Sequence, residues 1–128
     1  MALKITPEDK VFSQFIRMRA MVDSGGCEYC GRQVESYKQL QCSHFVGRRY
    51  QNTRFEPDNA CGLCYTCHNL FHDFSSINQD FFTKRIGTKR MEELEVVART
   101  IKKMTKERRE AIKADLKEKI KRLEQVSR

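Results

Sequence analysis

Apolar residues recur at helical spacing near the start of this chain and predict its first helix. Successive members of this set lie one, three, three and four positions apart in the sequence: Val11, Phe12, Phe15, Met18 and Val22. Such steps place them on one face of a helix. Thr6-Pro7-Glu8-Asp9 predicts the helix start, with Thr6 as N-cap, and Asp23-Ser24-Gly25-Gly26 predicts its end.

The second half of the chain predicts further helices. One runs from Cys64 to about Phe74 and places His68 and His72, four residues apart, on one face. A short helix begins at Asn78-Gln79-Asp80 and ends at Gly87. Thr88 caps the next helix, whose apolar stripe is Met91, Leu94, Val97, Ala98, Ile101 and Met104. Thr105 caps the last helix, whose stripe is Ile112, Leu116, Ile120 and Leu123.

Between these helical regions the apolar pattern predicts strands. Residues 40–45 lack a helical period, and a strand there brings Cys42 and His44 to one face. Residues 53–55 form a second short strand candidate, which Pro57-Asp58 ends. The simplest arrangement is a hairpin with a long, basic loop.

Composition narrows the class of protein. With 128 residues and 39% hydrophobic content, one compact domain buries only about two thirds of the surface of its unfolded chain, so a metal would help to stabilise it. The net charge of +8 favours an anionic partner such as nucleic acid; the alternative is that the lysines serve solubility alone. Residues 99–128 hold 12 basic and 5 acidic residues, so this arm either follows phosphates, pairs with another helix or is solvated.

Six cysteines are spread over the chain. No signal peptide or membrane span is apparent in the sequence, so we expect a cytoplasmic protein in which Cys-x-x-Cys pairs bind metal rather than form disulfides. Two such pairs have 33 residues between them and predict a structural Zn²⁺ site: Cys27, Cys30, Cys64 and Cys67. Cys61-Gly62-Leu63-Cys64 is an alternative second pair, and Cys64-Tyr65-Thr66-Cys67-His68 also satisfies the c-type haem pattern.

The histidines and arginines between residues 41 and 72 predict a reactive site. Hydrolysis of a phosphodiester needs a base, a cation and groups that grip phosphate. His44 can act as the base, while His68 and His72 can hold a divalent cation. The candidate phosphate-binding residues are Arg48, Arg49 and Arg54.

At these residues the chain resembles the HNH endonucleases of the ββα-metal fold. The resemblance implies that His44 is the general base, that Asn59 braces the loop between hairpin and helix, and that His68 binds the catalytic metal. It implies a further metal ligand in His72. The two cysteine pairs match the members in which zinc clamps the hairpin to the helix.

A narrower resemblance is to the phage recombination endonucleases called NinG or Rap. It rests on matches dispersed from about Val11 to the chain end, which include Phe15-Ile16-Arg17, Cys27-x-x-Cys30-Gly31, Ser43-His44-Phe45, Arg54-Phe55, Asn59, Cys64-x-x-Cys67 and Arg85-Ile86-Gly87. The resemblance implies a phage protein in a bacterial host that cuts branched DNA, such as Holliday junctions and D-loops, and leaves 5′-phosphates.

Two residues depart from the patterns of these families. Many HNH enzymes have Asp or His directly before the base, where this chain has Ser43, and His68 stands where Asn is expected in the Rap-like relatives. Imidazole ligands without a carboxylate suit Mn²⁺, Ni²⁺ or Zn²⁺ better than Mg²⁺.

The sequence therefore predicts an α+β fold with a small zinc-stapled ββα-metal core at residues 27–75. Residues 1–26 form a helix packed on this core, and residues 76–128 a basic helical extension whose stripes suit a homodimer. The predicted function is a metal-dependent DNA endonuclease acting on branched DNA. The alternatives are a zinc-dependent nucleic-acid binding module without catalysis, or an HNH nuclease for homing, restriction or packaging.

Overall fold

A computed structural model of the chain describes residues 3–100 and 102–126. Within them it has an α+β fold with four α-helices and one antiparallel pair of strands. In chain order the elements are α1 (Pro7–Ser24), β1 (Gln41–His44), β2 (Ala60–Leu63), α2 (Tyr65–Asp73), α3 (Ser75–Arg99) and α4 (Lys106–Val126). Short 3₁₀ turns at Tyr37–Gln39 and Pro57–Asn59 precede the two strands. No helix in the described ranges combines the length and apolar character needed to cross a bilayer.

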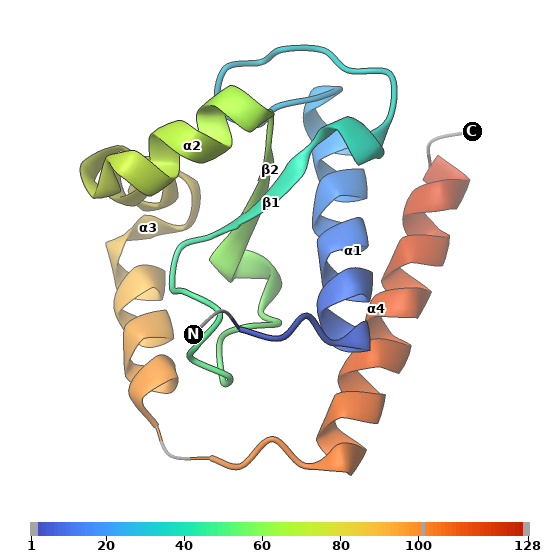
Figure 1. Ribbon diagram of the computed structural model, residues 1–128, viewed down its shortest axis with the longest axis vertical. Coiled ribbons are helices and arrows are strands. Elements are labelled where there is room, and N and C mark those ends of the chain that lie inside the picture. The colour runs from blue at the N-terminus through green and yellow to red at the C-terminus, as the bar shows by residue number, and fades with distance from the viewer. Residues whose placement is uncertain (1–2, 101, 127–128) are drawn as a thin grey trace.

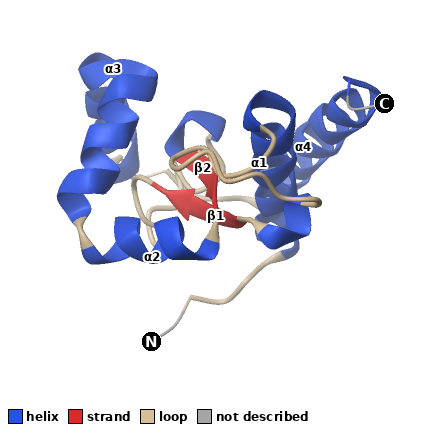
Figure 2. Ribbon diagram, turned by 90° about the horizontal axis from the view of Figure 1, so that it is seen from above, coloured by secondary structure: helices blue, strands red, loops and turns tan. Residues whose placement is uncertain are grey.

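The two strands lie between two pairs of helices. Figure 1 shows α1 and α4 side by side on one flank of the strands and α2 with α3 on the other, and Figure 2 shows the same order from above. Strand β1 pairs with β2 from Gln41 opposite Leu63 to His44 opposite Ala60. All four residues of β2 are buried, so this strand forms the centre of the fold.

Helix α1 is the main support of the sheet. As predicted, Thr6 caps it: its hydroxyl accepts from the Asp9 N–H at 3.2 Å, and the Asp9 carboxylate accepts from the Thr6 N–H at 2.8 Å. The helix ends at Gly25, whose φ of 70° is a left-handed conformation that glycine adopts without strain. A Cβ added to Gly62 would lie 2.6 Å from the Ala20 Cβ, so the absence of a side chain lets α1 approach β2.

The apolar stripe of α4 packs against α1 of the same chain. One core cluster joins Phe12, Phe15 and Ile16 of α1 to Leu116 and Ile120 of α4. Figure 1 shows that the two helices run in the same direction. The stripe that we expected to form a homodimer is therefore covered within the monomer.

Three predicted boundaries were wrong. Residues 53–55 form a turn, and the partner of β1 is β2. Helix α3 begins at Ser75 rather than Asn78. Gly87 has a non-helical φ of 84° and ψ of 156° and kinks α3, so the predicted break between two helices at Gly87 is confirmed. Helix α3 ends at Arg99, so Met104 lies in the linker, where it is nevertheless buried; Ile101 lies outside the described residues.

Candidate active site and metal centre

The four cysteines of the predicted zinc site come together. The sulfur atoms of Cys27, Cys30, Cys64 and Cys67 all lie within 4.8 Å of one another. The Sγ atoms of Cys30 and Cys64 are 3.8 Å apart, close to the edge of about 3.8 Å that a tetrahedron with Zn–S bonds of about 2.3 Å would have. This geometry fits one structural Zn²⁺ held by all four thiolates.

Backbone groups around the first cysteine pair favour a thiolate. Burial raises the pKa of Cys27, but hydrogen bonds from the N–H groups of Cys30, Cys64 and Tyr29 outweigh it and lower that pKa to about 7. Gly31, with φ of 79°, donates its N–H to the Cys27 carbonyl at 3.1 Å. The turn thus closes tightly around the ion position.

The two remaining cysteines lie outside this cluster. Cys61 is fully buried and Cys42 is half-buried. Burial raises the pKa of Cys42 to about 12 and that of Cys61 well above its ordinary value, so both are protonated at neutral pH. The geometry therefore favours the Cys64 and Cys67 pair over the alternative pair, and a four-cysteine site over haem attachment.

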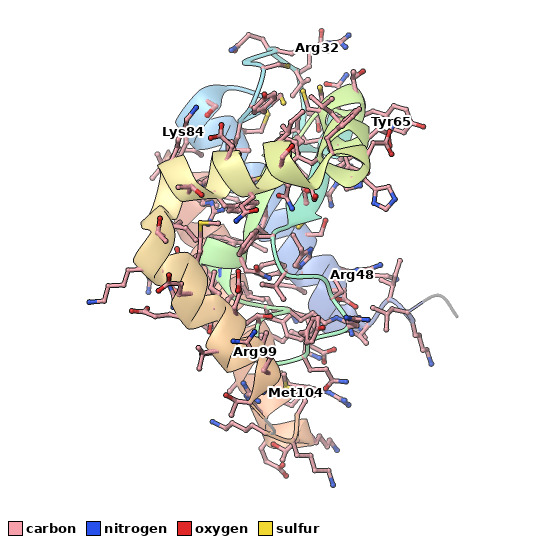
Figure 3. The ribbon with its side chains drawn as sticks, turned by 90° about the vertical axis from the view of Figure 1, so that its left-hand side faces the viewer. Arg32, Arg48, Tyr65, Lys84, Arg99 and Met104 are labelled. Carbon is pink, nitrogen blue, oxygen red and sulfur yellow. The ribbon has the colours of Figure 1, made fainter. Side chains whose placement is uncertain are left out.

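A cleft of about 710 Å³ lies next to this centre, between α1 and α2. Strand β1 contributes His44 to its lining, α2 contributes His68 and His72, and the loop after β1 contributes Arg48. The structure thus brings all three histidines to one cavity. Figure 3 shows Arg48 and Tyr65, the first residue of α2, on the same side of the molecule, and Lys84 on the opposite side.

His44 is held in one orientation. Its Nε2 lies 2.9 Å from the carbonyl oxygen of Arg54, and its ring centroid lies 5.5 Å from that of Phe12. A carbonyl can only accept, so Nε2 carries the proton and Nδ1 is the acceptor of the neutral ring. Burial lowers the pKa of His44 to about 4, although the hydrogen bond to the Arg54 carbonyl raises it.

Arg54 is fixed by a buried ion pair with Asp9 of α1. Both side chains are 7% exposed, the Nε of Arg54 donates to an Asp9 carboxylate oxygen at 2.8 Å, and Nη2 donates to the other. Burial raises the pKa of Asp9, but hydrogen bonds from Arg54 and Thr6 outweigh it and hold that pKa below its usual range. The expected phosphate-binding Arg54 therefore points into the protein, and its carbonyl, rather than its guanidinium, faces the site.

Asn59 braces the loop that connects the two strands, rather than the loop between the hairpin and the helix that the family resemblance implied. Its side chain is fully buried. Its Oδ1 accepts from the Val46 N–H at 2.7 Å, and its Nδ2 donates to the carbonyl oxygens of Val46 at 2.9 Å and Thr53 at 3.0 Å. One side chain thus fixes both ends of the loop from which Arg48 and Arg54 extend.

The wall of the cleft formed by α2 and the first turn of α3 offers atoms that suit a cation. His68 Nδ1 and Asn78 Oδ1 are buried and have no hydrogen-bond partner in the described part of the chain, and both residues line the cleft with His72. Burial lowers the pKa of His68, as does the nearby His72, which favours the neutral form that binds metal. The cysteine cluster is the one group of three or more His, Cys, Asp or Glu ligands among residues 3–100 and 102–126, so water or phosphate would complete a cation's shell here.

Comparison with known families assigns the chain. A family model described as "Bacteriophage Lambda NinG protein" matches residues 5–126. The chain belongs to the NinG family. No curated protein and no solved structure matches it.

The cleft of this NinG-family chain is also lined by basic residues that the sequence analysis did not assign to the site. Lys10 and Arg17, from α1, line the cleft together with Arg48. Arg49 instead lies over the ring of Tyr50, 4.7 Å from its centroid. The apolar stripe predicted α1, but it did not show which polar residues on the other side of the helix line the cleft. Once α1 is known to pack on β2, that polar face can be identified, because Lys10, Ser13 and Arg17 follow one another at steps of three and four residues.

Proposed function

We propose that this NinG-family protein is a metal-dependent DNA endonuclease of the HNH type that cuts branched DNA. The observation that carries the proposal is His44, a half-buried neutral imidazole that lines one cleft with His68 and His72. The order β1, β2, α2 is that of a ββα-metal core, with His44 at the end of the first strand and His68 on the helix.

His44 has the features that a general base needs. Its Nε2–H is committed to the Arg54 carbonyl, so Nδ1 can accept a proton from a water molecule at neutral pH. The resulting hydroxide attacks phosphorus, and the bond to the 3′ oxygen breaks, which leaves a 5′-phosphate. The Asp9–Arg54 ion pair keeps the carbonyl in place and so positions the imidazole.

His68 and His72 would hold the catalytic cation, and Asn78 adds a neutral oxygen to their wall. A divalent cation supplies charge stabilisation to the phosphate and to the leaving 3′ oxygen. Two imidazoles and an amide, without a carboxylate, suit Mn²⁺, Ni²⁺ or Zn²⁺ better than Mg²⁺. Arg48 supplies positive charge beside the same cleft.

The test is cleavage of a synthetic four-way junction, a linear duplex and a plasmid, each with Mn²⁺, with Mg²⁺ and without added cation at matched salt. We expect cation-dependent cutting that prefers the junction. His44→Ala should lower the rate by at least about 100-fold, because a positioned base contributes that much or more, while zinc content and DNA binding persist.

Binding of all three substrates without cutting under any cation would instead favour the zinc-dependent nucleic-acid binding module. Wild-type rates in His44→Ala would reject the role of His44 as base. Equal cutting of junction and duplex would reject the preference for branched DNA. We also propose that the protein makes paired cuts as a homodimer, whose subunits contact each other through a surface other than the covered α4 stripe. Light scattering measures the molar mass in solution and so tests for the dimer.

A further inference from the structure

Arg17 is held in the cleft without an anionic partner. It extends from α1, is half-buried and lines the cleft that contains His44. Its Nε donates to the Ser13 carbonyl at 3.1 Å, and its guanidinium carbon lies 5.1 Å from the centroid of the Tyr37 ring. These two contacts fix the plane of the guanidinium but leave its Nη atoms without a partner among the described residues.

Several other arginines of the molecule use these atoms inside the fold. Arg19 donates both Nη groups to backbone carbonyls, while Arg54 and Arg85 are paired with carboxylates. Arg90 faces three carboxylates. A partly buried guanidinium that is oriented in advance and has free donors is suited to bind an external anion, and its planar fork matches the oxygens of a phosphate.

Lys10 extends the same face of α1 towards the base. Lys10 and Arg17 are seven residues apart, two turns of helix, and both line the cleft. Phe12, whose ring contacts His44, lies five residues before Arg17. Five residues correspond to about 7.5 Å along the helix, a length comparable to the spacing of successive phosphates along one strand.

We propose that Arg17, with Lys10, binds the backbone of the cleaved strand, and that Arg17 binds a phosphate about one nucleotide from the bond that is cut. The inference rests on the proposed function. It adds that the α1 side of the cleft determines which phosphate of the DNA strand lies next to His44. Arg17 is a positioning residue. The cation-binding histidines lie on the opposite wall, so the strand would run between α1 and α2.

The first experiment measures binding of a fluorescent junction to the zinc-loaded protein, without other divalent cations, over a salt series. Arg17→Ala should weaken binding by about 10- to 100-fold at low salt. It should also reduce the slope of log K against log salt by about 0.7 to 0.9, the contribution of one phosphate. Lys84→Ala removes one positive charge on the opposite side of the molecule (Figure 3) and should change neither value appreciably.

The second experiment locates the contact with single methylphosphonate linkages, which remove the charge of one phosphate at a time. Wild type and Lys84→Ala should both lose affinity at a linkage about one step from the cut, whereas Arg17→Ala should be insensitive at that linkage. Arg17→Lys keeps the charge but not the fork, so it should keep the salt slope with weaker binding. This variant carries the test if Arg17→Ala fails to fold.

The outcomes separate this inference from the proposed function. An unchanged salt slope in Arg17→Ala, with sensitivity at every linkage retained, overturns the inference even if the protein cuts DNA. Conversely, an Arg17-dependent slope in a protein that cuts no substrate supports the site while rejecting the nuclease. Equal effects of Arg17→Ala and Lys84→Ala would also overturn it, because they would reflect net charge alone.

Discussion

A single hydrogen bond at His44 links the candidate chemistry to the frame of the molecule. The Arg54 carbonyl accepts from Nε2, and the Arg54 side chain is bound by Asp9, which also caps α1. The sequence predicted His44 as base and Thr6 as N-cap, since both follow local patterns. It could not predict that the Arg54 side chain is buried, because its partner Asp9 lies 45 residues away in the sequence. An arginine in a basic stretch has the same local sequence pattern whether its side chain is exposed or buried.

A titration of the histidine rings by NMR tests the environment of His44. Because its pKa is lowered to about 4, the ring should stay neutral from pH 8 down to about pH 5 and gain a proton only below that. Throughout this range the Nε2–H tautomer should be observed. With three histidines in the chain, the signal that disappears in His44→Gln assigns the resonance. A midpoint near the ordinary value of about 6.5 would contradict a half-buried base.

At the scale of elements, the core of the site is β1, the braced loop, β2 and α2. The sequence predicted β1 and α2 from their periods but placed the second strand at residues 53–55 rather than 60–63. Residues 60–63 are buried on both faces and so lack the alternation that identifies a strand with one solvated face. Asn59, just before β2, was identified through the family resemblance, and its three hydrogen bonds give the physical reason.

The packing of α4 on α1 can be tested with Leu116, which is 2% exposed between them. Leu116→Ala should lower the free energy of unfolding by about 2–5 kcal/mol, the usual cost of a buried leucine truncated to alanine. Urea unfolding of the zinc-loaded protein measures this loss. Val126→Ala is the control within the same helix: Val126 is 67% exposed, so the change should be within about 0.5 kcal/mol.

The same experiment distinguishes a covered stripe from a dimer contact. If α4 packs within the monomer, the loss in Leu116→Ala is independent of protein concentration. A midpoint of unfolding that rises with concentration in wild type, and no longer does so in Leu116→Ala, would return the stripe to the subunit interface.

For the whole molecule, the cysteine cluster ties the chain segment after α1 to the start of α2. Glu28, within the first cysteine pair, donates its N–H to the Gly62 carbonyl at 2.9 Å and accepts the Gly62 N–H on its carboxylate at 2.6 Å. The same carboxylate is paired with Arg85 of α3. A zinc ion bound by this cluster would hold together the elements that form both walls of the cleft, and the spacing of the cysteines was enough to predict the cluster.

Removing structural zinc and removing the proposed catalytic cation should have different consequences. Structural zinc contributes about 10–16 kcal/mol in small zinc domains, comparable to the entire stability of about 5–15 kcal/mol of an ordinary domain. We expect Cys64→Ser to lose zinc to a chelator and to unfold. Cys61→Ser, outside the cluster, should keep one zinc per chain, and His68→Ala should keep both zinc and fold while losing cleavage. Metal analysis measures zinc content, circular dichroism measures folding and the junction assay measures cleavage.

Loss of zinc in Cys61→Ser with retention in Cys64→Ser would reverse the ligand assignment. Unfolding of His68→Ala would show that the two metal sites are not independent.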